Sequence, residues 1–189
     1  MDIETITPAA AEPVTLAEAK AHLRVDHGDE DGLIEALISA ARADIETRTR
    51  HRFITQTVRL TMSGFPCRIR IPLWPVNSVI QVAYRDEADA EIVLDPGAYT
   101  LIKDRRPREV GPAYGHTWPI PRPHWNSVTM DVVVGHGDDG AAAPPDLIAA
   151  IKLTLGHLYE NREDLVAGVT VQPLSRGAEA LLTPHALHI

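Results

Sequence analysis

The chain has 189 residues, 44% of them hydrophobic, and a formal net charge of −8 at pH 7. This length and apolar fraction allow one domain, or one domain with an insertion, around a real core, whereas the acidic balance argues against a free-standing nucleic-acid binder, which usually has a basic footprint. The single cysteine, Cys67, excludes an internal disulfide framework and a cysteine-only metal cage, and no apolar run suits a signal core or a membrane span.

The first elements predicted are an arm and two helices. Residues 1–13 are rich in Thr, Ala and Pro and are expected to form a flexible arm. Thr15 and Glu18 have the spacing of a capping box, in which each side chain satisfies a free backbone donor of a short helix. Asp29 to Arg50 carries apolar residues at three- and four-residue spacing, with acids at its start and bases at its end. Residues 14–56 are therefore expected to form the N-terminal helices of the core.

Residues 57–135 change to a period of two and predict a β-rich insertion. Strands are expected at Val58–Met62, Cys67–Ile71, Ser78–Arg85, Glu91–Leu94, Tyr99–Ile102 and Ser127–Val134. Residues 103–126 lack this period and are expected to be irregular. Cys67 shares a strand face with Ile69 and Ile71, so we expect it to be buried. Short strands at close spacing predict a small antiparallel sheet or barrel inserted between helices.

A second major helix is predicted at residues 144–163, because proline is tolerated in the first helical turn. Gly156 inside it predicts close packing against another helix. Residues 164–189 are expected to form an extended tail, whose apolar side chains must be buried on this subunit or on a partner. Those tail residues are Val169, Val171, Leu174, Leu181 and Leu182. The predicted fold class is α+β: a helical core, an inserted small antiparallel β domain and an extended C-terminal tail.

No catalytic, metal or cofactor site is predicted from the motifs. The phosphate loop G-x-x-x-x-G-K-[ST], the dinucleotide pattern G-x-G-x-x-G and the zinc helix H-E-x-x-H are absent. His136 to Asp139 has the composition of a turn and lacks a second ligand cluster. An enzyme that uses Cys67 beside Arg68 and Arg70 remains an alternative, although its activation needs a base in place.

The one basic concentration is the loop that contains Lys103, Arg105, Arg106 and Arg108. Two interpretations are open: a solvated hairpin tip, which can pair with an acidic neighbour, or a contact with nucleic-acid phosphate. The two N-terminal helices also suggest a helix-turn-helix. We reject that interpretation because the joining turn, Asp26 to Asp31, is strongly acidic and repels phosphate.

The order of several segments resembles the phage head-tail connector (adaptor) family. The segments that carry the resemblance are Val14 to Lys20, His22 to Asp26, Leu33-Ile34, Leu37-Ile38, Gln56-Thr57, Phe65-Pro66, Ile71 to Leu73, Pro75-Val76, Pro144-Pro145, His157 to Glu163 and Pro173-Leu174. The resemblance spans most of the chain, and the order and number of the segments carry it, since none is catalytic. Residues between Lys103 and Ser127 match least well, so the role of the basic loop stays open.

This resemblance implies a non-enzymatic protein without cofactors. Such adaptors form a ring, usually a dodecamer, beneath the portal protein of a tailed phage or a phage-like gene transfer particle. They extend the channel for double-stranded DNA, which passes without sequence-specific binding, and they provide the platform for a neck or tail protein. The helices would form the ring, and the apolar tail would reach the portal or a neighbouring subunit.

The implied location is the neck of the particle, with the bacterial cytoplasm before assembly and no membrane contact. The net negative charge suggests a conduit that does not grip its cargo; unchanged DNA delivery after lysine replaces the channel-facing acids would contradict this hypothesis. Two other roles remain open: a tail-side neck protein, such as a stopper or tail-completion factor, and a DNA-binding accessory factor that uses the basic loop.

Overall fold

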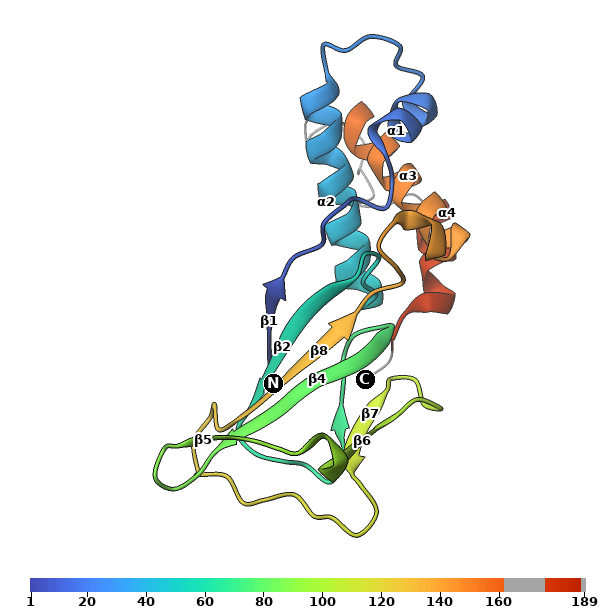
Figure 1. Cartoon of the computed structure of the whole chain (residues 1–189). Helices are drawn as coiled ribbons and strands as arrows, with labels where there is room; N and C mark the ends of the chain where they lie inside the picture. The colour runs from blue at the N-terminus through green and yellow to red at the C-terminus, as the bar shows by residue number, and fades with distance from the viewer. Residues whose placement is uncertain (162–175, 188–189) are drawn as a thin grey trace, which may run out of the picture. The chain divides into compact units, whose positions relative to one another are not determined.

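The computed structural model describes residues 1–161 and 176–187, which form two compact units (Figure 1). The β unit contains Met1–Ala10, Thr55–Gly135 and Leu187. The helical unit contains Ala11–Ile54 and the described part of His136–Ala186. Helices and antiparallel sheets together confirm the predicted α+β class. None of the helices described here combines the length and the apolar character that a membrane span requires.

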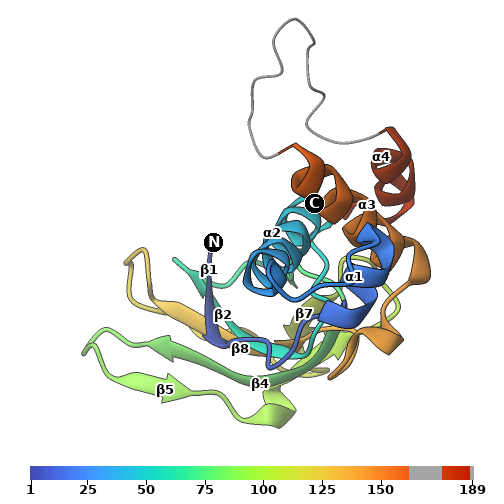
Figure 2. The same ribbon diagram turned by 90° about the horizontal axis from the view of Figure 1, so that it is seen from above.

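The helical unit is built around two long helices. Its α-helices are α1 (Leu16–Leu23), α2 (Asp31–Thr49), α3 (Pro145–Glu160) and α4 (Arg176–Leu182), with short 3-10 turns η2 (Gly140–Ala142) and η3 (Thr183–His185). α2 packs against α3, α1 contacts both of them, and α4 lies against α3 (Figure 2). The apolar stripe of α2 is buried at Ile34, Ile38, Ala41 and Ile45.

The capping box that the sequence predicts for α1 is present. The Glu18 backbone N–H donates to Thr15 Oγ1 at 3.2 Å, and the Thr15 N–H donates to Glu18 Oε2 at 3.0 Å. α1 ends at Leu23, because Arg24 adopts the left-handed conformation at φ 60°. Gly156 of α3 faces α1 closely: a Cβ there would lie 3.6 Å from His22 Nε2, which confirms the predicted helix contact.

On the charged side of α2, one of two acid–base pairs in which the acid lies four residues before the base forms an ion pair and the other does not. Arg48 binds Asp44 at 2.9 Å, as the four-residue spacing predicts. Glu46 has the same spacing to Arg50, but it is only 7% exposed and accepts the backbone N–H of Phe53 at 3.0 Å. Arg50 is the left-handed residue that ends the helix, so it no longer continues the face on which Glu46 lies.

The β unit contains two antiparallel sheets. Its strands are β1 (Asp2–Thr7), β2 (Gln56–Met62), β3 (Ile69–Arg70), β4 (Val76–Arg85), β5 (Glu91–Val93), β6 (Tyr99–Ile102), β7 (Glu109–Pro112) and β8 (Val128–Val134), with the 3-10 turn η1 (Pro96–Ala98). One sheet has the order β1-β2-β8-β4-β5 and the other β3-β7-β6. β7 lies in the segment 103–126, for which irregular structure was predicted, so that prediction is wrong for these four residues.

β1 replaces much of the expected N-terminal arm. It pairs antiparallel with β2, with Ile3 opposite Leu60 and Glu4 opposite Arg59. Most of its residues are exposed, since it is an edge strand. An exposed edge strand needs no apolar period, so composition alone gave no signal for it.

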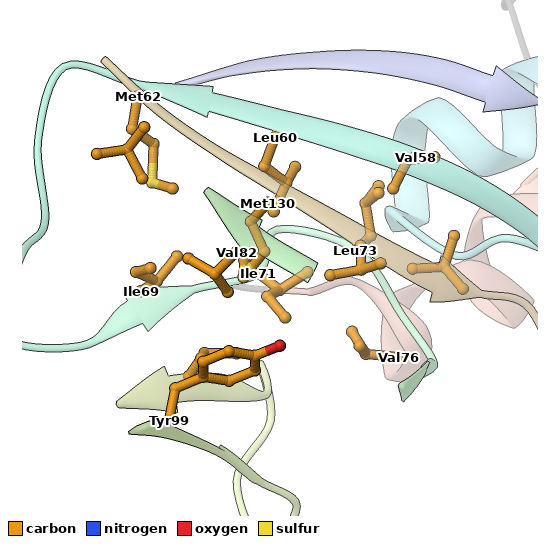
Figure 3. Packing of buried hydrophobic residues seen from close by; sticks show 14 residues of the cluster. Val58, Leu60, Met62, Ile69, Ile71, Leu73, Val76, Val82, Tyr99 and Met130 are labelled. Carbon is orange, nitrogen blue, oxygen red and sulfur yellow. The ribbon is translucent and has the colours of Figure 1, made fainter. Parts of the chain in front are cut away.

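The core of the β unit lies between the two sheets (Figure 3). Leu60, Val82 and Met130 come from the five-stranded sheet, and Ile69 and Ile71 come from β3 and the residue that follows it. β2 alternates between buried and half-buried residues along its whole length, as the sequence predicts. The expectation that Cys67 is buried is wrong: it is exposed, because it precedes the two-residue strand β3 and does not follow its alternation.

Candidate functional site: a basic surface on the β unit

The basic segment 103–108 is the loop of the β6–β7 hairpin. Ile102 pairs with Glu109, so the segment closes the hairpin directly (Figure 1). Lys103, Arg105 and Arg106 are exposed in this loop, while Arg108 is half-buried. A short hairpin between two paired strands therefore presents most of the positive charge of the segment to solvent.

Strand β3 adds two further arginines to the same place. β3 pairs with β7, with Ile69 opposite Val110 and Arg70 opposite Glu109. Arg68 Nη1 lies 3.5 Å from Glu109 Oε2, Arg70 Nε lies 3.3 Å from Oε1, and Arg105 Nη1 lies 4.0 Å from Oε2. The Glu109 carboxylate thus contacts three arginines from two separate segments of the chain.

Glu109 is buried, but its arginine partners are not. The residue is 5% exposed, whereas the side chains of Arg68, Arg70 and Arg105 are 52%, 64% and 56% exposed. A buried carboxylate requires opposite charge and hydrogen bonds nearby, which these guanidinium groups supply. Each guanidinium has five N–H donors in a fixed fork, so contact with one shared carboxylate leaves donors directed at solvent.

Trp74 supports the remaining arginines of the loop. The guanidinium carbons of Arg106 and Arg108 lie 5.1 Å and 5.2 Å from the centre of its ring, within cation–π range. Arg108 also donates to the carbonyl oxygen of Val76 through Nη1. We call the group formed by Arg68, Arg70, Lys103, Arg105, Arg106 and Arg108 the basic surface.

The loop cations could be identified from the sequence, whereas Arg68, Arg70 and Glu109 were not predicted to be their neighbours. The alternation of Arg68 and Arg70 with apolar residues was a usable signal, because it placed both arginines on a solvent-facing side. The pairing of β3 with β7 could not be anticipated, since β7 was not predicted. Without that pairing, residues 68–70 and 103–109 are distant parts of the chain.

The predicted tail residues fall partly outside the described structure. Val169, Val171 and Leu174 lie outside the described residues. Leu181 is half-buried and Leu182 is 7% exposed, both in α4, which packs against α3. A groove of about 300 Å³ beside α4 is lined by Arg48, Thr49, Glu179, Leu182, Thr183 and Ala186. The role of the five predicted tail residues as an interface with the portal or a neighbouring subunit stays a prediction.

A histidine cluster in the helical unit connects η3 to the rest of the unit. The rings of His51 and His136 stack, and His51 Nδ1 lies 2.9 Å from His136 Nε2. His185 meets His51 edge-on and binds Asp146 at 2.5 Å. In residues 1–161 and 176–187, no group of three or more His, Cys, Asp and Glu is arranged to hold a metal ion. We therefore interpret the cluster as packing of the helical unit.

Comparison with known proteins supports the family resemblance. Residues 13–92 match the profile of the phage gp6-like head-tail connector proteins. A chain in the neck of an empty gene transfer agent (GTA) particle computed with C6 symmetry has a TM-score of 0.83 at 26% identity, and the match covers 100% of this chain and 97% of that chain.

Two further solved structures give the same result. A chain of the virion of a native GTA particle has a TM-score of 0.83 at 28% identity, and one in a native GTA neck computed with C12 symmetry has 0.80 at 27%. Both matches cover 100% of this chain and 97% of the other chain. Comparison with curated protein sequences gives no significant match. The resemblance to head-tail connectors is thereby confirmed, and these similar proteins are structural parts of particles, not enzymes.

Proposed function

From the match of residues 13–92 to head-tail connector proteins and of the whole chain to GTA neck chains, we propose that this protein is a head-tail connector (adaptor) subunit. The observation that carries the proposal is the whole-length similarity to particle neck chains, at a TM-score of 0.83. Both units of the chain take part in that match, because it covers 100% of this chain. The β-rich insertion therefore belongs to the proposed role together with the helices.

The proposed assembly is a homo-oligomeric ring, a dodecamer, beneath the portal protein. The similar chains come from necks computed with C6 and C12 symmetry. Cyclic closure joins two different patches head to tail, so each subunit needs two dissimilar contact surfaces. The ring extends the DNA channel of a phage or phage-like particle and offers its other face to a neck or tail protein.

The proposed contact with the portal, or with a neighbouring subunit, is the apolar part of the tail. It comprises Val169, Val171, Leu174, Leu181 and Leu182. Apolar side chains that gather in one segment need to be buried, either on their own subunit or on a partner. Before assembly the subunit is proposed to be in the bacterial cytoplasm. It is then incorporated into the neck when the portal is present.

The first test is the particle mass by light scattering, for the protein alone and mixed with the portal protein of its own genome. A shift to a ring-sized complex on mixing is the expected result. A mixture with a purified tail-side neck protein distinguishes the two faces of the ring. Binding to the tail-side protein but not to the portal would instead favour a stopper or tail-completion role, and binding to neither would contradict the connector proposal.

A further inference from the structure

The basic surface concentrates positive charge in an acidic chain. Its cations come from β3, its flank and the β6–β7 loop, while the same segments, 68–70 and 103–109, contain only the acids Asp104 and Glu109. The whole chain has a net charge of −8. The local balance is therefore opposite in sign to that of the protein.

Contacts within the β unit hold the five arginines of the basic surface in place. Glu109 holds Arg68, Arg70 and Arg105 within 4.0 Å of its carboxylate oxygens, and Trp74 lies under Arg106 and Arg108. Fixed guanidinium groups lose less conformational entropy on binding a ligand than freely rotating side chains. Because the arginine side chains around Glu109 remain more than half exposed, their unused N–H donors can reach an external anion.

An acidic patch on a second copy of the chain is the competing partner. The acidic β4–β5 turn lies at the other end of the β unit (Figure 1). Its acids already have partners: Asp89 binds Arg122 at 2.6 Å and Arg85 at 3.2 Å, and Asp86 accepts the N–H groups of Ala88 and Ala90. This turn is a poor counterpart for the basic surface, because docking would have to compete with those contacts.

We propose that the basic surface binds the phosphate backbone of double-stranded DNA without reading its sequence. Arginine forks match phosphate oxygens in a bidentate geometry, and contacts of this kind carry no base information. The choice of duplex DNA as the ligand rests on the proposed connector role, which brings a duplex close to every subunit. The net charge of −8 gives the chain as a whole no attraction for DNA, so the local positive charge of the basic surface has to supply it.

The test measures binding of the full chain to a fluorescent duplex of mixed sequence, from about 50 to 200 mM salt. The variant Lys103→Gln/Arg105→Gln/Arg106→Gln removes loop charges but leaves Arg68 and Arg70 to balance Glu109. The control Arg24→Gln/Arg48→Gln/Arg50→Gln removes the same charge from exposed arginines of the helical unit. Thermal melting of both variants checks that they fold.

We expect the affinity of the unchanged protein to fall linearly with salt on logarithmic axes. Each lost phosphate contact should reduce the slope by about 0.9, and the loop variant should therefore show a much smaller slope on every duplex sequence. The control should keep the slope of the unchanged protein. Equal losses in the loop variant and the control would overturn the proposal, because bulk charge would then explain the binding.

The same samples, mixed with the portal, separate this proposal from the connector role. One possible result is that the unchanged protein binds duplex DNA, the loop variant does not, and neither protein binds the portal. This result would support the proposed DNA contact and contradict the connector role. Portal binding without salt-sensitive duplex binding would support the connector role and overturn the proposed DNA contact. Salt-dependent self-association that only the loop variant loses, without duplex binding, would assign the surface to another copy of the chain and overturn the proposal.

Discussion

Asp131 is the central charge on the face of the five-stranded sheet opposite the core. It lies on β8 between Arg59 of β2 and Gln81 of β4. Arg59 donates to its two oxygens at 2.7 Å and 2.8 Å, and Gln81 donates at 2.9 Å. The hydrogen bonds from Arg59 lower the pKa of Asp131, although burial opposes them.

This arrangement predicts a pH dependence of stability. Because the pKa of Asp131 is lower in the folded state, its contribution is present above the ordinary Asp pKa of about 3.9 and is lost as pH falls through the folded value. Asp131→Asn should therefore flatten the fall of the unfolding free energy below about pH 4. Urea denaturation across that range measures it, with the exposed Asp104→Asn as control. Parallel curves for Asp131→Asn and the unchanged protein would contradict the prediction.

Gly140 occupies a place where no side chain fits. A Cβ there would collide with the Pro13 carbonyl oxygen and would lie 2.7 Å from the carbonyl carbon. Gly140→Ala should destabilise the protein by about 1–3 kcal/mol, since backbone atoms must move. Gly32 in α2 is the matched control, because nothing lies within 4 Å of its Cβ position, and Gly32→Ala should stabilise by up to about 1 kcal/mol. Chemical denaturation giving the same sign for both changes would contradict this comparison.

At the scale of the element, the capping box of α1 gives a defined stability prediction. Thr15→Ala removes the acceptor of the Glu18 N–H and should lower the unfolding free energy by about 1 kcal/mol. Thr47→Ala on α2 is the control, because that hydroxyl only donates to the Ala43 carbonyl on an exposed face. A control effect within about 0.5 kcal/mol is expected. If both substitutions lower the thermal melting point equally, the cap contributes nothing specific.

Elements with a long apolar period could be predicted from the sequence, and short or exposed elements could not. α2 and α3 bury a continuous stripe, and β2 alternates over seven residues, so their positions follow from periodicity. β1 is an exposed edge strand, and β7 contains Gly111 and Pro112 within four residues. The basic surface depends on β7, so only its loop cations could be named in advance.

At the scale of the whole molecule, the two groups of predicted tail residues should respond differently to substitution. Val169→Ser/Val171→Ser/Leu174→Ser should weaken the complex with the portal without lowering the melting temperature, if this segment serves the proposed contact. Leu182 is 7% exposed in α4, so Leu182→Ala should instead destabilise the subunit by about 2–5 kcal/mol. Light scattering and thermal melting measure the two effects. A triple variant that binds the portal normally would remove the tail from the proposed interface.

The chain leaves the helical unit and returns to it at neighbouring points. Ile54 forms a bridge with Gly137, and within the β unit Gln56 pairs with Val134. A gene that joined Ile54 directly to His136 would therefore keep the path of the helical unit, and β1 would lose its sheet neighbour β2 along with the excised stretch. The stretch from Thr55 to Gly135 is thus a single insertion in the path of the helical unit, so one deletion would remove it without leaving a wide gap in that unit.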